Sequence, residues 1–284
     1  MSQLIHMRQR IKTIKTIEKI THAMRLIAIS THTRLRLKEQ KLQKYHTEVE
    51  LLFKLVGSFI KNLQHPFFKQ KENGQQLLII IGSQKGLCGN FNTMLVQASK
   101  KIIQDNNNNS CDIITIGKKI YETILNKVGI KPLFHFDSFK ADESTIVAQK
   151  IINYIKNSEV TYQKITVISS FAKSFFNQIP QTLQLLPLSQ KIITSSEEQP
   201  IFIFDQPPLE LFDQLLDQYI TATLSCKIFA TVIAEHAARF VSMDSATRNA
   251  KNILHVTQLQ YNKLRQSKIT RELIELSGSL HSGM

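Results

Sequence analysis

Several features that would mark a common class of protein are missing from this chain of 284 residues. Its three cysteines, Cys88, Cys111 and Cys226, are an odd number at wide spacing, which argues against a disulfide framework and favours a reduced interior. No apolar run approaches the ~18 residues that a membrane-spanning helix needs. Global disorder is excluded, because 42% of the residues are hydrophobic and 20% are charged. The composition therefore predicts a folded protein of one or two domains.

The usual nucleotide and metal motifs are missing too. The one glycine-rich loop, GSQKGLCGNFN at 82–92, has no Gly-Lys-Ser/Thr, and its glycines are not spaced as in the dinucleotide fingerprint. The next strand ends in Gly117-Lys118-Lys119, where an acidic residue would hold a ribose. The nine histidines form no His-Glu-x-x-His motif. We interpret the loop as a strand-to-helix turn that needs positive φ, and we predict no cofactor and no metal. Nucleotide binding in the loop and a nucleophilic Cys88 are the alternatives.

Proline is also missing before Pro66 and again from 209 to 276, and in both stretches apolar residues recur every three or four positions, as in a helix with one buried face. In the first stretch they are Leu4, Met7, Ile11, Ile14, Ile17, Ile20, Met24, Ile27, Leu35, Leu42, Tyr45, Val49, Leu52, Val56, Phe59 and Leu63; in the second they include Leu211, Leu215, Tyr219, Ala222, Cys226, Phe229, Ile233, Ile253, Leu264 and Leu273. At ~1.5 Å per residue the second helix would be roughly 100 Å long. We therefore predict that the two helices pair as a long coiled coil. A bundle of shorter helices broken by turns is the alternative.

Between these stretches, short apolar runs alternate with helical patterns. Strands are predicted at 77–82, 112–117, 133–136 and 165–169, with added strands at 183–188 and 202–204, and helices near 92–105, 118–128 and 142–157. This order predicts an α/β fold, a Rossmann-like domain with a mostly parallel sheet covered on both faces. Pro187 favours an edge position for its strand. We expect three segments: an N-terminal coiled-coil helix at 1–65, the Rossmann-like α/β domain at 66–207 and a C-terminal coiled-coil helix at 208–284.

The net charge of +14 points to an anionic partner, which could be a protein surface, a nucleic acid or membrane headgroups. Residues 1–50 hold eleven Lys or Arg against four Glu, a local net charge of +7. A mechanical or assembly protein and a nucleic-acid binder with a basic coiled-coil arm both fit these features, and an enzyme built on the α/β domain is a third possibility. Tyr45 is the only aromatic residue before Phe53, so the basic arm lacks the interleaved aromatics that stack on bases.

Five motifs, spread over nearly the whole length of the chain, resemble the gamma-subunit family of bacterial F-type ATP synthases. They are RIKTIKTIEKITHAMRLIA at 10–28, GLCGNFN at 86–92, IFIFDQPPLELFDQLLDQYI at 201–220, EHAARFVSMDSATRNAKNIL at 235–254 and YNKLRQSKITRELIEL at 261–276. One motif alone would be a moderate signal, whereas all five in this order and at these spacings are highly specific.

The resemblance implies a non-catalytic rotor subunit, in which the terminal helices form a long antiparallel coiled coil that enters a ring of alpha and beta subunits. It further implies that the α/β domain sits on the ring of c subunits and holds the epsilon subunit, with no nucleic-acid partner. Membrane association would arise only through the complex, at the cytoplasmic face of the bacterial plasma membrane. Rotation driven by ion flow would force the catalytic sites of the beta subunits through their states during ATP synthesis or hydrolysis.

The resemblance also assigns contacts to individual positions. Near the loops of the beta subunits it places Met24, Arg25, Arg265, Gln266, Thr270 and Glu272; near the c ring it places a foot made of Phe202, Phe204 and Asp205. The C-terminal tip at 276–284 would lie in a mostly apolar bearing.

This chain departs from the family pattern at several positions. Thr31 stands where the family has a lysine, Gln84 where it has an aspartate, and Asn90 where it has a glycine, although asparagine tolerates a left-handed conformation. Asp244 and Arg248 invert the signs of the usual Lys and Asp, and their spacing predicts an exposed pair worth ~0.2–0.5 kcal/mol. On that basis, exchanging both charges should leave folding nearly unchanged.

Overall fold

The protein is described by a computed structural model that covers residues 2–60, 67–68, 74–105, 111–158, 160–188 and 204–281. It divides into two compact units: unit 1 is Met1–Ala28 with Phe240–Met284, and unit 2 is Ile29–Arg239. Two long helices contribute to both units, α1 (Ser2–Ser58, 57 residues) and α5 (Pro208–His281, 74 residues). The predicted uninterrupted terminal helices are therefore confirmed, and the alternative of shorter helices is wrong. The units cut through both helices, so the three segments expected from the sequence stay a prediction.

The ends of the long helices follow from local chemistry. α5 starts at Pro208, where a residue without a backbone N–H costs no helical hydrogen bond. The carbonyl of Pro207 accepts bonds from the backbone N–H groups of Glu210 and Leu211. α1 ends at Ser58, earlier than the predicted end at 65, and 61–66 lie outside the described residues.

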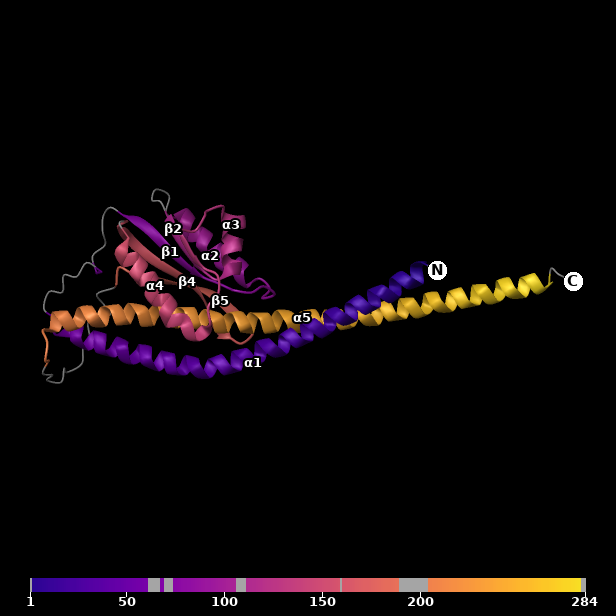
Figure 1. The fold of residues 1–284 in the computed structure, drawn as a ribbon, viewed down its shortest axis with the longest axis horizontal. Coiled ribbons are helices and arrows are strands. Elements are labelled where there is room, and N and C mark those ends of the chain that lie inside the picture. The colour runs from indigo at the N-terminus through magenta and orange to yellow at the C-terminus, as the bar shows by residue number, and fades with distance from the viewer. Residues whose placement is uncertain are drawn as a thin grey trace. The chain divides into compact units, whose positions relative to one another are not determined.

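In unit 1 the two helices run antiparallel. Thr21 pairs with Thr247 and Arg25 with Asp244, while Leu4 shares a groove with Leu264, so positions that advance along α1 meet positions that recede along α5. The indigo start of α1 and the yellow end of α5 lie side by side in Figure 1. The antiparallel arrangement that the family resemblance implied is confirmed here.

Unit 2 contains a five-stranded sheet whose order is β3-β2-β1-β4-β5. Its elements are β1 (Gln75–Ile81), α2 (Phe91–Asp105), β2 (Cys111–Ile116), α3 (Lys118–Val128), β3 (Phe134–Phe136), a 3-10 turn η1 (Ala141–Glu143), α4 (Ser144–Asn157), β4 (Tyr162–Ser174) and β5 (Asn177–Leu186). All pairings are parallel except that between β4 and β5, which confirms the mostly parallel sheet. β5 lies at an edge, as Pro187 predicted.

Helices cover both faces of this sheet. On one face Ile79 and Val167 join a core that includes α4 and the first part of α5; on the other, Leu78 and Ile80 pack against α2 and α3. Figure 1 shows α2 and α3 on one side of the sheet and α4 beside α5 on the other. The strands are apolar on both sides for this reason, which explains why they read as continuous hydrophobic runs.

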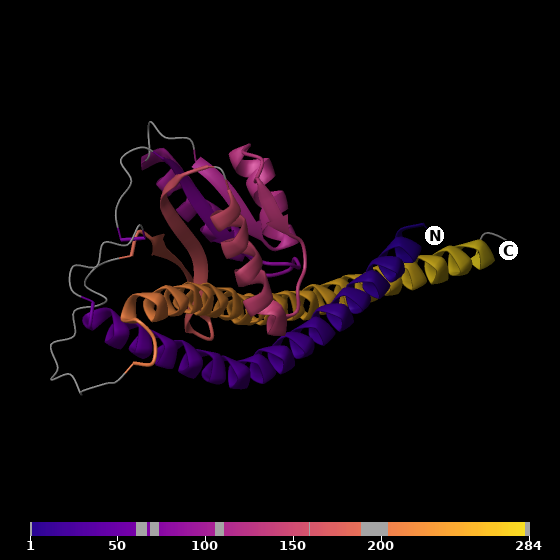
Figure 2. The ribbon, with the colours of Figure 1, turned by 60° about the vertical axis from the view of Figure 1, so that its left-hand side comes forward.

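The first part of α5 is buried on two sides, which the sequence did not predict. The expected stripe meets α1, where Phe229 and Ile233 pack on Leu35. A second stripe of fully buried residues packs toward the sheet and α4: Phe212, Leu216, Ile220, Leu224 and Ile228. A helix that is apolar nearly all round belongs in a protein interior. Figure 2 shows this orange part of α5 running beside α1 in unit 2.

Two strands differ from the prediction. β4 and β5 form a hairpin that is much longer than the runs at 165–169 and 183–188, and it turns at Phe175-Phe176, a dipeptide with no turn signal in the sequence. The predicted strand at 202–204 falls mostly outside the described residues.

Candidate functional site

The loop that follows β1 lies at the carboxyl edge of the sheet, where open α/β folds bind their ligands. Leu87 and Gly89 adopt positive φ values of 65° and 62°, which confirms the predicted turn. Asn90 does not take the left-handed conformation suggested for it; its carbonyl instead accepts a helical bond from Met94 as α2 begins. At Gly82, an added Cβ would lie 2.5 Å from Cβ of Ile120, so α3 packs directly on the backbone of this loop.

Two charged side chains from α5 fill the space beside this loop. Glu235 and Arg239, one turn apart, have only 3% and 5% of their surface exposed and form an ion pair. Oε2 and Oε1 of Glu235 accept the backbone N–H groups of Gln84 and Lys85 at 3.2 and 3.4 Å. Arg239 donates from Nε to the Gly86 carbonyl and from Nη2 to the Lys85 carbonyl, both at 3.1 Å. The place where a Rossmann fold would hold pyrophosphate is thus occupied by the protein's own side chains.

The loop is also tied to the sheet and its helices. The amide of Gln84 makes two bonds to the backbone of Phe139, one as donor at 2.9 Å and one as acceptor at 3.3 Å. Asn92 bonds both the backbone N–H and the hydroxyl of Ser83. Gln84, which stands where the family pattern has an aspartate, therefore has a structural role within this chain.

Two reactive side chains, Cys88 and His236, lie near the loop. Burial raises the pKa of the Cys88 thiol, so the nucleophile hypothesis finds no support. Burial, and then the positive charges of Arg239, Lys85 and Arg34 together with His32, lower the pKa of His236 to about 4. Nδ1 of His236 lies 3.3 Å from Nη1 of Arg239, which suits a neutral ring that accepts a bond. Within the described ranges, no three His, Cys, Asp or Glu residues gather as metal ligands would.

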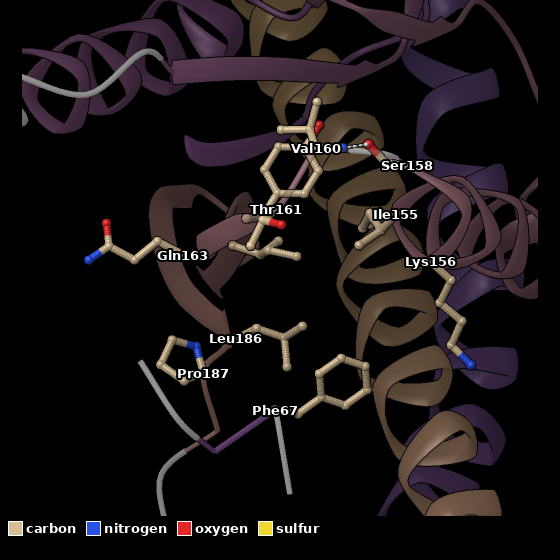
Figure 3. Close-up of a pocket in the computed structure, with 11 residues that line it drawn as sticks. Phe67, Ile155, Lys156, Ser158, Val160, Thr161, Gln163, Leu186 and Pro187 are labelled. Carbon is tan, nitrogen blue, oxygen red and sulfur yellow. Dashed lines mark hydrogen bonds between the residues drawn. The ribbon is translucent and has the colours of Figure 1, made fainter. Parts of the chain in front are cut away.

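A pocket of about 270 Å³ lies where α4 ends and β4 starts, away from the carboxyl edge of the sheet. Figure 3 shows Phe67 and Leu186 on one side of it and Val160 on the other. No Asp, Glu, His or Cys is among its described lining residues, and Lys156 is engaged by Asp217 at 2.5 Å. Tyr162 also lines the pocket, and its hydroxyl donates to Oδ2 of Asp112 at 3.2 Å. Both titratable groups of the described lining are thus already paired.

In unit 1 the contact between α1 and α5 contains a polar layer. Nη1 of Arg25 lies 2.7 Å from Oδ1 of Asp244, and Arg248 lies 3.1 Å from the other oxygen of the same carboxylate. The Arg25 hydrogen bond is the main reason why the pKa of Asp244 is lowered. The predicted Asp244–Arg248 pair is present, but Asp244 also faces the other helix, with a side chain only 25% exposed. Exchanging both charges would put a lysine against Arg25, so the expectation of unchanged folding is wrong.

We predict that Asp244→Lys lowers the free energy of unfolding by about 1–2 kcal/mol, because attraction to Arg25 turns into repulsion at a half-buried site. Denaturant unfolding of the full chain measures this loss, and Arg25→Glu combined with Asp244→Lys should recover most of it. Arg248→Ala is the control, since that side chain is 72% exposed. If Asp244→Lys were as stable as the wild type, Arg25 would not be its partner in solution.

The structure places the remaining predicted contact residues as follows. Arg265, Gln266, Thr270 and Glu272 are exposed on α5, where Glu272 pairs with Lys268 at 3.4 Å. Leu264, a member of the predicted apolar stripe, is 39% exposed, and the nearby Ile269 is 44% exposed. The prediction that the stripe is buried here is therefore wrong. On α1, Met24 is half-buried.

Of the three foot residues, only two are described. The Phe204 ring packs edge-on against Phe59 at 5.2 Å between centroids, and Asp205 is exposed. Phe202 lies outside the described residues. None of the described helices has a stretch apolar enough to cross a membrane.

The chain is similar to proteins of one kind throughout its length. A family model described as ATP synthase matches residues 3–282. The ATP synthase gamma chain of Geotalea daltonii is 28% identical over 289 residues, covering 99% of each chain, and that of Rickettsia prowazekii is 28% identical over 290 residues, covering 97% of this chain and 98% of its own. A chain of the Euglena gracilis mitochondrial ATP synthase, from a structure of its OSCP, F1 and c-ring, has a similar fold, with a TM-score of 0.69 at 14% identity over 99% of this chain and 94% of its own.

Proposed function

The chain belongs to the ATP synthase family as a gamma chain, a rotor subunit of the central stalk, and we propose on this basis that it transmits rotation of a c ring to catalytic beta subunits. The observation that carries the proposal is the family match over 3–282, combined with two unbroken helices of 57 and 74 residues. The alternative from the sequence, a nucleic-acid binder, rests on the basic charge of the chain alone.

We propose that the chain itself catalyses no reaction and holds no cofactor. Supporting this, Glu235 and Arg239 fill the carboxyl edge of the sheet, and Cys88 is buried with a raised pKa. ATP turnover would then belong to the beta subunits, and this chain would supply the moving surface that changes their conformation.

The described surface of unit 1 fits a shaft that turns inside other subunits. Large apolar side chains are exposed on both helices: Ile17, Ile20 and Ile27 on α1, and Ile253, Val256 and Leu259 on α5. Exposed apolar surface of this extent marks interaction sites. We propose that these faces, with Met24 and Arg25, meet alpha and beta subunits, and that the tip at 276–284 sits in an apolar bearing.

We further propose that the α/β part of unit 2 holds the epsilon subunit and stands on the c ring through Phe202, Phe204 and Asp205. The chain would then associate with the membrane only through the complex, at its cytoplasmic face. The three segments 1–65, 66–207 and 208–284 would correspond to one half of the shaft, the platform and the other half of the shaft.

The contact with beta subunits is tested at Arg265 and Gln266, which are exposed on α5. A guanidinium group binds carboxylates through a fixed fork of donors. Its loss from an interface commonly costs about 2–5 kcal/mol of binding free energy. We expect the double variant Arg265→Ala, Gln266→Ala to have the thermal stability of the wild type but to lower assembly or ATPase activity of the reconstituted complex.

Two comparisons make this test specific. Lys251→Ala changes another exposed cation of α5 and should leave activity unchanged. The isolated chain, assayed alongside, should hydrolyse no ATP, and turnover there would contradict the non-catalytic proposal. Full assembly and activity in the double variant would remove these two residues from the contact.

A further inference from the structure

We propose that the buried Glu235–Arg239 pair is a positioning device that fixes the angle of α5 about its own axis against the sheet. Torque applied to the α/β part of unit 2 then reaches α5 without slip. This inference rests on the rotor function proposed above, and it assigns to two residues a role that neither the nucleotide-site interpretation nor the beta-subunit contacts include.

The first reason is the direction of the bonds. From one turn of α5, Glu235 accepts two backbone N–H groups of the loop and Arg239 donates to two of its carbonyls, so four bonds of both polarities hold one short peptide, Gln84 to Gly86. A planar guanidinium and a carboxylate offer their partners in fixed directions. Rotation of α5 by even part of a turn would break all four bonds together.

The second reason is that the loop is itself fixed to the rest of the sheet. Gln84 bonds the backbone at Phe139 twice, Asn92 at the start of α2 bonds Ser83 twice, and the Ser83 carbonyl accepts the N–H of Lys119 in α3. The loop therefore connects α5 with three separate elements. Leu87, at positive φ, shows that the loop is held in a conformation that its sequence does not prefer.

The third reason is the nature of the other contacts between α5 and the sheet. Most are apolar, and Ala234 and Ala238 present small smooth surfaces to the core beside α2 and α3. Apolar packing is non-directional and sets a helix angle weakly. The ion pair Lys156–Asp217 also joins α4 to α5, but its side chains are 39% and 46% exposed, so water competes for it. Two neutral hydrogen bonds of α5 are also buried: the Thr231 hydroxyl accepts the backbone N–H of Ser170 at 3.2 Å, and the Ser225 hydroxyl bonds that of Ser144 at 3.1 Å. The Glu235–Arg239 pair adds four charge-assisted bonds to one short peptide, and such bonds are roughly twice as strong as neutral ones.

A buried ion pair is weak evidence for stability, because apolar side chains of similar volume often replace it without loss. An apolar replacement of the pair can therefore remove its positioning role while the chain stays folded. Glu235→Met with Arg239→Met should fold, since it leaves no unpaired charge, yet it removes all four bonds to the loop. Arg239→Lys keeps the charge and loses the fork. Asp217→Asn, which breaks the exposed pair, is the matched control.

Each variant is assembled into the complete complex in sealed vesicles, where ATP hydrolysis and the membrane potential that it builds are measured together. A potential-sensitive dye reports pumping whichever ion is carried. In the free chain, hydrogen exchange is followed at the backbone amides of Gln84 and Lys85. We expect the double Met variant to exchange these amides about tenfold faster or more, and to lose part of the potential generated per ATP hydrolysed while hydrolysis continues. Arg239→Lys should show a smaller loss of the same kind, and Asp217→Asn none.

Amide exchange unchanged in the double Met variant would overturn the inference, because the bonds to the loop would then not exist in solution. Faster exchange with wild-type potential per ATP would overturn it too, since the loop would be held for local reasons only. Should the double Met variant fail to fold, Arg239→Lys decides through the potential generated per ATP, and a wild-type value there overturns the inference. Failure of the rotor function itself looks different: the wild-type chain would then generate no potential in the assembled complex.

Discussion

Phe53→Ala is expected to lower the free energy of unfolding of the chain by about 3–5 kcal/mol, the largest effect predicted for a single substitution here. Phe53 has no exposed surface. Its ring stacks on Phe212 at 4.9 Å and on Tyr219 at 4.8 Å, so α1 and α5 meet in unit 2 through three aromatic rings. Truncation would leave a cavity that two rings cannot both close, and the aromatic contacts would be lost with it.

Leu52→Ala is the matched control for this substitution. Leu52 is the preceding residue of the same helix, but 48% of it is exposed, so its truncation should change stability by about 0.5 kcal/mol or less. Thermal or denaturant unfolding of the two variants gives the comparison directly. Equal losses in the two variants would mean that α1 does not present Phe53 to α5 in solution.

The pair Leu52 and Phe53 also shows what periodicity can predict. Repeats of three and four residues predicted long helices correctly, because the absence of proline and the recurrence of apolar residues are properties of the helix alone. They predicted the buried face only in part, since Ile14, Leu35, Val49 and Val56 of the expected stripe on α1 are buried. Of the expected stripe on α1, Ile17, Ile20, Ile27, Tyr45 and Leu52 are exposed, whereas His32 and Phe53 point inward.

This error has a physical cause. An ideal helix drifts by about 20° per heptad against a seven-residue repeat, so over many turns the true contact face moves away from any fixed set of positions. In addition, the proposed rotor would carry apolar residues on the face that meets other subunits. A single sequence does not distinguish such a face from the face on which the two helices pack together. The α/β part was easier, because its strands are buried on both sides.

The candidate site was harder to predict than the fold. The sequence identified the loop at 82–92 and excluded the nucleotide motifs, but it gave no role to Glu235 or Arg239, which in EHAAR look like ordinary surface charges. One signal was available. Glu235 and Arg239 are opposite charges four residues apart in ATVIAEHAARF, a stretch otherwise dominated by apolar residues. Such a stretch lacks the further charged residues that a solvent-exposed helix face would have. Their partners lie some 150 positions away along the chain, and only the fold brings them together.

His236 provides the second large effect, a loss of stability in acid. Burial and the nearby cations Arg239, Lys85 and Arg34, with His32, lower its pKa to about 4 in the folded chain, against 6.5 for the free side chain. Between these two values the unfolded chain binds the proton and the folded chain does not. Stability is therefore lost as the pH falls from about 6.5 to 4, and a shift of this size corresponds to at most about 3 kcal/mol. The carboxylate of the preceding residue, Glu235, is already engaged by Arg239.

We therefore predict that His236→Gln makes the free energy of unfolding less dependent on pH in this window, by up to about 3 kcal/mol between pH 7 and pH 4. Burial also lowers the pKa of His32 and His46, so the wild-type slope is a sum and only the difference between variant and wild type reports on His236. His255→Gln, which changes an exposed histidine of the same helix, is the control. Chemical denaturation at several pH values measures the slopes. If His236→Gln and His255→Gln gave the same slope as the wild type, His236 would take up its proton in the folded chain without cost, and its neutral contact with Arg239 would not hold in solution.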